Sequence, residues 1–361
     1  MRQVTAAVIG AGAWGTAIAK VIAGKGCKTD LWCRREEQAA EINSARVNSR
    51  YLPDVRLPEC LSATSDIAAA ANGKDFLILA VPSLFLLDKA KELLTVPSIR
   101  EGQTSIGIIT KGFLESSAGP RLIIDTLEDY MPGFYRGKLV YISGPSHAEE
   151  VARGTITGLI AASQNARESI RFRYLLKTQN LFVFSSLDAR GVQVAAAAKN
   201  IIAIAFGVFD ALKSRNSRVP SAGSVKNLLG DNTGSLLLAA GLSEIQLLGR
   251  AMGATHAETF TSIAGVGDLD VTCRSVYGRN RRFGREIIEK KILDPFKDID
   301  DLIARIAEIG YMPEGIAASR HVNRLQEKYR LKMPLCSIVY SILNRGTKAE
   351  DALNSYLNRA R

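Results

Sequence analysis

The sequence predicts an α/β domain with a mostly parallel, doubly wound sheet over residues 1–188, followed by an all-α domain over residues 189–361. Three observations favour this division. Short apolar runs alternate with helical patterns as far as about residue 188, as in successive βαβ units. A glycine-rich turn joins the first apolar run to the first helix. After residue 188 the strand patterns stop, and helical patterns continue to the C-terminus.

The first strand, turn and helix occupy residues 4–24. The strand VTAAVIG runs into Gly10-Ala11-Gly12-Ala13-Trp14-Gly15, and the helix TAIAKVIA follows. This is GxGxxG between a strand and a helix, which predicts a Rossmann-type dinucleotide site. Gly10 allows the tight turn, Gly12 lets the backbone approach a pyrophosphate, and Gly15 lets the helix pack on the strand. The alternative is a tight turn that binds no ligand.

The second predicted strand is residues 28–33, and the residues at its end indicate which cofactor is preferred. A site that prefers NAD usually has Asp or Glu there, whereas this strand ends in Cys33-Arg34-Arg35. Asp30 lies nearby, but we expect it inside the strand. Two guanidiniums suit a 2′-phosphate, so we predict that NADP(H) is preferred and that NAD(H) is possible. Alternatively, the two arginines form a solvated pair at the head of the next helix.

Three later strand patterns, residues 75–83, 104–112 and 138–143, each end in a loop. Pro82 and Lys111 stand at the carboxyl ends of the first two, where doubly wound folds place their ligand loops. Residues 157–163 and 181–186 are expected to add strands to the same sheet.

The third of these strands is followed by a Gly-Pro turn and an expected helix that includes Ser146, His147 and Ala148. Backbone amides near Ser146 would offer an anion site at the start of that helix. His147 could act as a general base, but a structural role beside a helix cap is favoured.

The second half is organised around residues 191–209, which are apolar on every side apart from the central pair Lys199-Asn200. This pattern predicts a helix buried all round. A charge at the centre of a short span argues against a membrane helix. A buried lysine must find partners or lose its proton, and either outcome suits acid/base catalysis. The alternative is that Lys199 reaches the surface or forms a structural salt bridge.

Downstream of this helix, residues 213–229 are polar and basic and are expected to form an exposed loop. Asp268 is expected in a glycine-rich turn. The stretch GRNRRFG, residues 278–284, concentrates arginines beside an asparagine and suits a single phosphate. Taken alone, the same stretch could also bind nucleic acid.

Amino-acid composition limits the kinds of protein and ligand that this sequence can represent. Hydrophobic residues make up 47% and charged residues 23% of the chain, as in ordinary globular proteins, and the formal net charge is +11. Because no long block of like charge occurs, phosphorylated small molecules are favoured over nucleic acid. The five cysteines form no CxxC pair and there are three scattered histidines, so no metal site is predicted. Reduced thiols and an N-terminus without a signal-peptide apolar region indicate a cytoplasmic protein.

Taken together, these motifs resemble the soluble NAD(P)-dependent sn-glycerol-3-phosphate dehydrogenases of bacterial type. The resemblance extends nearly end to end and rests on six motifs in order: GAGAWGTA, ITKGF, SGPSHAEEV, AAAAKNIIAIAFG, AGVGDLDVTC and GRNRRFG. It implies reduction of dihydroxyacetone phosphate to sn-glycerol 3-phosphate for phospholipid synthesis, with no nucleic acid or membrane partner, by an enzyme that is usually a homodimer.

The resemblance also implies two sets of site residues. The cofactor set is Gly10, Gly12, Ala13, Trp14, Gly15, Arg34, Arg35, Tyr51, Pro82, Lys111, Ala148, Arg279, Met312 and Glu314. The substrate set is Lys111, Gly144, Ser146, Lys199, Asp268, Gly278, Arg279 and Asn280. Lys199 is the expected general acid, Asp268 holds its ammonium, Lys111 polarises the substrate, and Arg279 with Asn280 grips the phosphate.

The sequence departs from the family pattern at three places. Gly278 stands where the family usually has serine, Ala240 appears where it has arginine, and residues 213–229 are longer than usual. One rival hypothesis is another Rossmann dehydrogenase with a lysine acid, of the β-hydroxyacid or 6-phosphogluconate type. The other is a nucleotide-sensing or nucleic-acid-binding protein that uses its positive charge.

Overall fold

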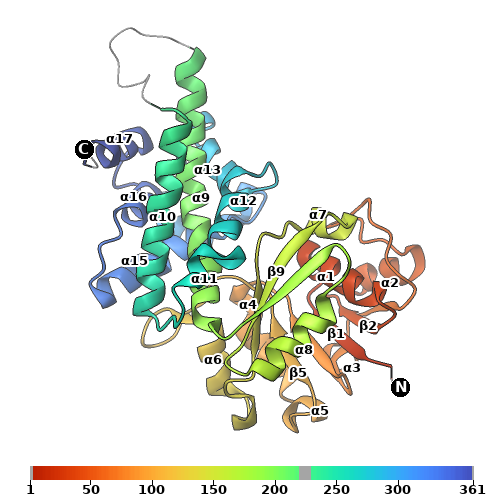
Figure 1. Ribbon diagram of the computed structural model, residues 1–361. Helices are drawn as coiled ribbons and strands as arrows, with labels where there is room; N and C mark the ends of the chain where they lie inside the picture. Colours follow the sequence, from red (N-terminus) through yellow and green to blue (C-terminus); the bar gives the residue numbers. More distant parts are fainter. Residues whose placement is uncertain (1–2, 219–228, 360–361) are drawn as a thin grey trace. The chain divides into compact units, whose positions relative to one another are not determined.

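A computed structural model describes residues 3–218 and 229–359, which form two compact units (Figure 1). Unit 1 is Met1–Leu114 with Arg121–Gln193, and unit 2 is Glu115–Pro120 with Val194–Arg361. One helix begins at Ala189 and continues through the point of division. The expected domain boundary between residues 188 and 189 therefore stays a prediction.

Unit 1 is built on an eight-stranded sheet in the order β10-β9-β8-β5-β4-β1-β2-β3. The strands are β1 (Thr5–Ile9), β2 (Lys28–Trp32), β3 (Leu61–Thr64), β4 (Phe76–Leu79), β5 (Ser105–Ile108), β8 (Val140–Ser143), β9 (Thr157–Ala162) and β10 (Leu181–Ser186). All neighbours are parallel except β8 and β9. The prediction of a mostly parallel, doubly wound sheet is confirmed.

The strand order reverses beside β1. Strands β2 and β3 extend to one side of it, and β4, β5 and β8 extend to the other. Chain connections therefore diverge from the carboxyl end of β1, and a ligand crevice forms where they part. The glycine-rich turn follows β1 directly, so the local sequence signal and the global topology indicate the same edge of the sheet.

Helices of unit 1 cover the sheet and contribute to its core. They are α1 (Ala13–Gly24), α2 (Glu36–Ala45), α3 (Ile67–Ala71), α4 (Ser83–Leu93), α5 (Pro97–Arg100), α6 (Ile123–Tyr130), α7 (Ala148–Arg153) and α8 (Ala166–Leu176), with a 3₁₀ turn η1 (Gly133–Tyr135) and a small hairpin of β6 (Phe113–Leu114) and β7 (Arg121–Leu122). Ile18 and Ile22 of α1 share one buried cluster with Val8 of β1 and Phe172 of α8. Strand and helix faces thus supply a common apolar core.

Every regular element in the described part of unit 2 is helical, which confirms the predicted all-α half. Its helices are α9 (Ala189–Arg218), α10 (Asp231–Ala251), α11 (Glu258–Thr261), α12 (Asp268–Arg274), α13 (Arg279–Glu289), α14 (Ile299–Ala304), α15 (Gly315–Tyr329), α16 (Pro334–Leu343) and α17 (Ala349–Arg359), with a π-helical turn η3 (Ile263–Gly267) and a 3₁₀ turn η4 (Ile306–Ile309). Residues 191–209 are buried all round, as predicted. Residues 189–215 are long and apolar enough to span a membrane, but their most apolar window lies wholly inside the protein.

Two glycines let α9 and α13 approach closely. A Cβ on Gly207 of α9 would lie 2.0 Å from the carbonyl oxygen of Arg281, and one on Gly284 of α13 would lie 2.1 Å from that of Ile204. Neither separation is sterically possible, so the crossing of the two helices requires glycine on both. Helix α10 runs beside α9 (Figure 1), and a Cβ on its Gly241 would meet the side chain of Ile202 at 2.6 Å.

The expectation of an exposed loop over residues 213–229 is wrong at its start. Helix α9 continues to Arg218, and Lys213 donates a hydrogen bond to Asp231 at 2.6 Å. Helix propensity of the preceding alanine-rich run extends the helix into the polar residues. Residues 219–228 lie outside the described residues.

Candidate functional site

The glycine turn has the stereochemistry that a dinucleotide requires. Gly10 has φ +124°, and a Cβ there would lie 2.9 Å from the carbonyl oxygen of Ala80. A Cβ on Gly15 would lie 1.9 Å from the oxygen of Gly10, so only glycine lets α1 start this close to β1. A Cβ on Gly12 would meet no atom within 4 Å. That open space faces the start of α1, where N–H groups suit a pyrophosphate, so the turn fits the predicted cofactor.

A buried amide network, which the sequence did not reveal, holds this turn. The carbonyl of Ala11 accepts hydrogen bonds from Gln38 Nε2 at 2.8 Å and from Asn48 Nδ2 at 3.1 Å. Asn48 also donates to Thr16 Oγ1 at 2.8 Å. Gln38 and Asn48 are nearly inaccessible to water. Gln38 could have indicated this network, because it is a polar residue that shares the buried face of α2 with Ala39.

Arg34 and Arg35 follow β2 at the carboxyl edge of the sheet. Arg34 is exposed, and Arg35 is the residue that precedes α2. Asp30 lies inside β2, as expected, and forms an ion pair with Lys74. Because Asp30 is committed to that pair, the strand end offers no carboxylate of its own to a ribose.

The two aromatic residues of the predicted cofactor set differ in their exposure to solvent. Tyr51 is 41% exposed, and Trp14 is partly buried against the unit 1 core.

Loops at the carboxyl ends of β4, β5 and β8 carry the other predicted residues of unit 1. Pro82 precedes α4, and half-buried Lys111 follows β5. The Thr110 hydroxyl donates to the Val81 carbonyl at 2.7 Å, and the Tyr141 hydroxyl donates to the Thr110 carbonyl at 2.9 Å. These bonds join the loops that follow β4 and β5 to each other and to strand β8.

The helix predicted to include Ser146 and His147 begins instead at Ala148. Gly144 has φ +143°, and the Ser146 hydroxyl donates to the Gly144 carbonyl at 2.9 Å. This local hydrogen bond keeps the two residues in a turn, because a serine side chain that satisfies nearby backbone competes with helix formation.

In unit 2, Lys199 is buried in an ion pair. Its side chain is 4% exposed and that of Asp268 is 1% exposed, and the ammonium contacts Asp268 Oδ1 directly. The ammonium also donates to Thr272 Oγ1 at 2.8 Å, and that hydroxyl donates to the Asp268 carbonyl at 2.6 Å. Because Thr272 donates its hydroxyl proton to the Asp268 carbonyl, its oxygen can only accept from the lysine. Sequence reasoning did not identify Thr272, although it lies one helical turn after Asp268.

Asp268 is the first residue of α12 rather than part of a turn. A π-helical segment, η3, leads into it, and such segments often occur at functional sites. A Cβ on Gly265 would lie 2.0 Å from the Phe260 carbonyl oxygen, which explains one glycine of the AGVGD motif.

Beside this pair, Asn200 and Asn280 connect three helices. Asn280 Nδ2 donates to Asn200 Oδ1 at 3.0 Å, and Asn280 Oδ1 accepts from the N–H of Gly315 at 2.8 Å. Asn200 Nδ2 lies 3.5 Å from Glu314 Oε2. Asn280 is 7% exposed, so most of its hydrogen-bonding capacity serves the protein.

The arginines of the GRNRRFG stretch have different roles. Arg281 pairs with Asp210 at 2.6 Å, Arg282 with Glu286 at 3.0 Å, and Arg285 with Glu289. Arg279 lies 3.9 Å from Glu314, and its side chain is 58% exposed. Each of the four guanidiniums thus has a carboxylate partner in unit 2, and because the Arg279 contact is the longest, Arg279 is the most available to an anion such as a phosphate.

Gly278 precedes α13, which begins without a side-chain cap. A Cβ there would lie 2.9 Å from the Thr272 carbonyl oxygen. The family serine would therefore crowd the backbone of this protein.

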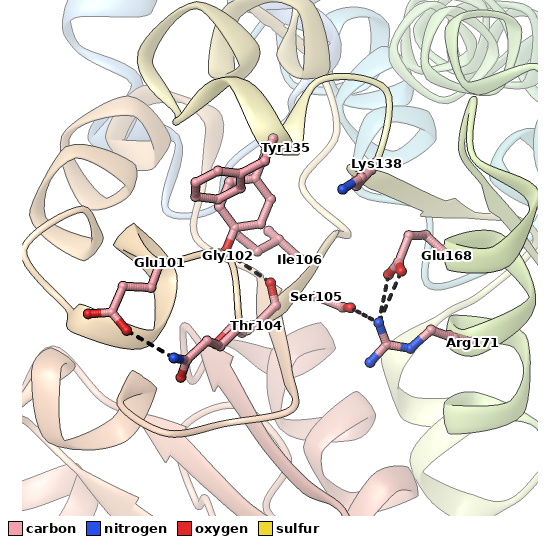
Figure 2. Close-up of a pocket in the computed structure, with 11 residues that line it drawn as sticks. Glu101, Gly102, Thr104, Ser105, Ile106, Tyr135, Lys138, Glu168 and Arg171 are labelled. Atoms are coloured by element: carbon pink, nitrogen blue, oxygen red, sulfur yellow. Dashed lines mark hydrogen bonds and ion pairs between the residues drawn. The ribbon is translucent and has the colours of Figure 1, made fainter.

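A cavity of about 320 Å³ lies at the opposite edge of the unit 1 sheet, near the amino end of β5 (Figure 2). Its charged and polar side chains bond mainly to one another: Arg171 to Glu168 at 3.0 Å, and Gln103 to Glu101 at 2.9 Å. Because the glycine turn follows the carboxyl end of β1, this cavity is separate from the dinucleotide edge.

Two family models match the chain. Residues 5–169 match the N-terminal part of NAD-dependent glycerol-3-phosphate dehydrogenase, and residues 188–354 match its C-terminal part. The chain belongs to the NAD-dependent glycerol-3-phosphate dehydrogenase family. The resemblance drawn from six motifs is thereby confirmed, as is the expectation that the chain is an NAD(P)-dependent oxidoreductase.

Relatives of this dehydrogenase are similar over nearly their full length. Glycerol-3-phosphate dehydrogenase (NAD(P)+) of Treponema denticola is 52% identical, over 97% of each chain. The protein of the same name from Bacillus velezensis is 34% identical, over 98% of this chain and 94% of the relative. A crystal structure of glycerol-3-phosphate dehydrogenase from Coxiella burnetii superposes with a TM-score of 0.81 at 31% identity, covering 98% of this chain and 99% of that one.

Proposed function

We propose that Lys199 donates the proton when this enzyme reduces dihydroxyacetone phosphate to sn-glycerol 3-phosphate with NAD(P)H. The observation that carries this assignment is the buried contact of Lys199 with Asp268 and Thr272. A lysine side chain with 4% exposure, bound by a carboxylate and a hydroxyl, is held in one place, as a positioned proton donor must be.

The reaction needs a proton and a positive field at the carbonyl oxygen. When bound, NAD(P)H would supply the hydride for the carbonyl carbon, and the carbonyl oxygen would then need a proton and a positive charge beside it. Lys199 supplies that positive charge and transfers a proton to the oxygen, and in the reverse direction it accepts the proton. Asp268 and Thr272 orient the amine throughout, so little reorganisation is required.

The remaining residues receive binding roles as part of the same proposal. In unit 1, Lys111 polarises the substrate, with Gly144 and Ser146 beside it. In unit 2, Arg279 grips the phosphate, using remote binding energy to position the carbonyl. Asn280 contributes mainly by fixing the start of α13, because it bonds to Asn200 and Gly315.

The proposed cofactor preference is NADP(H). It is supported by Arg34 and Arg35 after β2 and by the commitment of Asp30 to Lys74. The first turn of α2 also carries Glu36 and Glu37, which reduce the positive field of the two arginines. A preference of about tenfold, equivalent to about 1.4 kcal/mol, is therefore expected rather than strict selectivity.

A homodimer in the cytoplasm completes the proposal. It is supported by the family resemblance and by an odd number of scattered cysteines, which suits reduced thiols. Light scattering of the purified protein measures the oligomeric state directly.

The decisive experiment follows NADPH absorbance with and without dihydroxyacetone phosphate. Oxidation that depends on this substrate is the expected result. A folded protein that binds NADPH but shows no turnover above background would refute the proposed reaction. Arg279→Ala tests the Arg279 assignment, because the KM for dihydroxyacetone phosphate should rise strongly without that guanidinium.

A further inference from the structure

The segment between η4 and α15, residues 311–314, carries Met312 and Glu314 of the predicted cofactor set. Within the described residues, the N–H groups of Tyr311, Met312 and Glu314 donate to no backbone carbonyl, and Pro313 has no N–H to donate. The carbonyls of Pro313 and Glu314 accept hydrogen bonds from the first turn of α15, so the backbone fixes the far end of the segment better than the near end. Side-chain contacts therefore contribute much of what defines its conformation.

Both ends are attached to α13. At the far end, Asn280 accepts the hydrogen bond from the Gly315 N–H at 2.8 Å. At the near end, the Tyr311 hydroxyl donates to Glu286 Oε2. Helix α13 is itself fixed on α9 by the contact of Gly207 with Gly284. The segment is thus attached to the element that also carries Arg279.

Glu286 is an unusual anchor for a loop. Its side chain is 6% exposed, and Oε1 accepts hydrogen bonds from Arg282 at 3.0 Å and from Lys290 at 2.8 Å. The Arg282 guanidinium also lies 4.4 Å from the centre of the Tyr311 ring, so tyrosine and arginine cover the carboxylate together.

The hydrogen-bond donors around Glu286 determine the direction of its pKa shift. Burial alone would raise the pKa of Glu286, but the hydrogen bonds from Lys290, Tyr311 and Arg282 outweigh it and the pKa is lowered. Burial, and then the bond to Glu286, raises the pKa of Tyr311, so its hydroxyl keeps the proton that it donates. A charge-assisted hydrogen bond of this kind is among the stronger side-chain contacts.

We propose that Glu286 is a positioning residue for the dehydrogenase: through the Tyr311 hydroxyl it holds residues 311–314 in the conformation that binds the dinucleotide. This inference rests on the proposed cofactor role of Met312 and Glu314. It predicts that loss of the anchor weakens dinucleotide binding more than it slows the chemical step. Lys199 and its partners Asp268 and Thr272 have their own contacts and remain in place.

The test is Tyr311→Phe, which removes the hydroxyl and keeps the ring against Arg282. If the binding-competent fraction of the segment falls to about a tenth, the Kd for NADPH, measured by its fluorescence, rises about tenfold. The kcat at saturating NADPH should change less than about threefold, since chemistry after binding is intact. Glu286→Gln should give a similar rise, and the double variant should exceed the larger single effect only slightly, because the two residues share one contact.

The matched control is Glu308→Gln in η4. Glu308 accepts two hydrogen bonds from Arg305, at 2.9 and 2.8 Å, whereas the Tyr311 hydroxyl bonds to Glu286. It should leave the NADPH Kd unchanged. A Tyr311→Phe protein that melts normally and keeps its Kd within twofold of the unmodified protein would overturn the proposal, even if Glu286→Gln failed to fold. If the unmodified protein itself failed to bind NADPH, the proposed function would fall instead.

Discussion

Replacement of Lys199 by methionine tests the proposed proton donor. The structure shows that this change alone cannot separate a loss of chemistry from a loss of stability. Methionine fills much of the lysine volume and removes the amine. It also leaves the Asp268 carboxylate, which is 1% exposed, without its cation. Loss of activity in this variant could therefore come from lost chemistry or from a damaged unit 2.

The size of the structural effect can be anticipated from burial. Removal of one partner of a buried ion pair costs about 3–5 kcal/mol, because the other charge stays desolvated. For a domain of about 150–250 residues, each kcal/mol lowers Tm by about 2–4 °C, so a fall of roughly 6–20 °C is expected. The double variant Lys199→Met with Asp268→Asn removes both charges. It should recover most of the lost Tm, since replacing both partners of a buried ion pair by uncharged residues often changes stability little.

Activity should behave differently from stability. Loss of a positioned general acid lowers kcat by about 10²–10⁴-fold, and the double variant should remain as inactive as the single one. The assay is steady-state NADPH oxidation with dihydroxyacetone phosphate, alongside a thermal melt and an NADPH binding curve for each variant. A double variant that regains both Tm and turnover would show that Lys199 and Asp268 are only a structural pair.

Three further outcomes are expected. Arg34→Ala with Arg35→Ala should lower kcat/KM for NADPH about tenfold and leave that for NADH nearly unchanged; equal use of both cofactors by the unmodified protein would remove the basis for the preference. Gly284→Ala should lower Tm because its Cβ would lie 2.1 Å from a carbonyl oxygen of α9, whereas Gly24→Ala, with no atom within 4 Å, should not. Burial, aided by Arg320, lowers the pKa of His321 from 6.5 to about 4, so below pH 6.5 the unfolded chain takes up a proton that the folded chain does not. The free energy of unfolding should thus fall by up to about 3 kcal/mol between pH 6.5 and 4, and His321→Gln should flatten that slope in urea melts at several pH values.

Periodicity and glycine placement were sufficient to predict the class of the unit 1 fold, a mostly parallel, doubly wound sheet, but not its strand order. Such a sheet places its ligand crevice at the carboxyl end of the first strand, which is where the glycine turn lies. The antiparallel pairing of β8 with β9 could not be anticipated, because an apolar run of four residues carries no sign of strand direction. The start of α7 was also missed, since the Ser146 hydroxyl bonds locally to Gly144 and delays the helix.

The polar partners of the site were harder to predict than its fold. Thr272 and Asn48 are ordinary residues in their own segments, and their importance comes from contacts across 73 and 32 positions. Local patterns cannot encode such pairs. Gln38 is the exception, because a polar residue on the buried face of a short helix already requires a partner.

The glycines explain how separate motifs become one site. Lys199 and Asn280 are 81 positions apart in sequence, yet Asn200 and Asn280 share a hydrogen bond because α9 and α13 touch through Gly207 and Gly284. A side chain at either glycine would separate the helices and move α13 away from Asn200, the residue next to Lys199. Substitution of either glycine should therefore lower activity as well as stability, although each contacts only the facing helix. Glycine in the middle of a helix normally costs stability, so its presence twice at one crossing indicates that close approach, rather than helix propensity, decides the residue there.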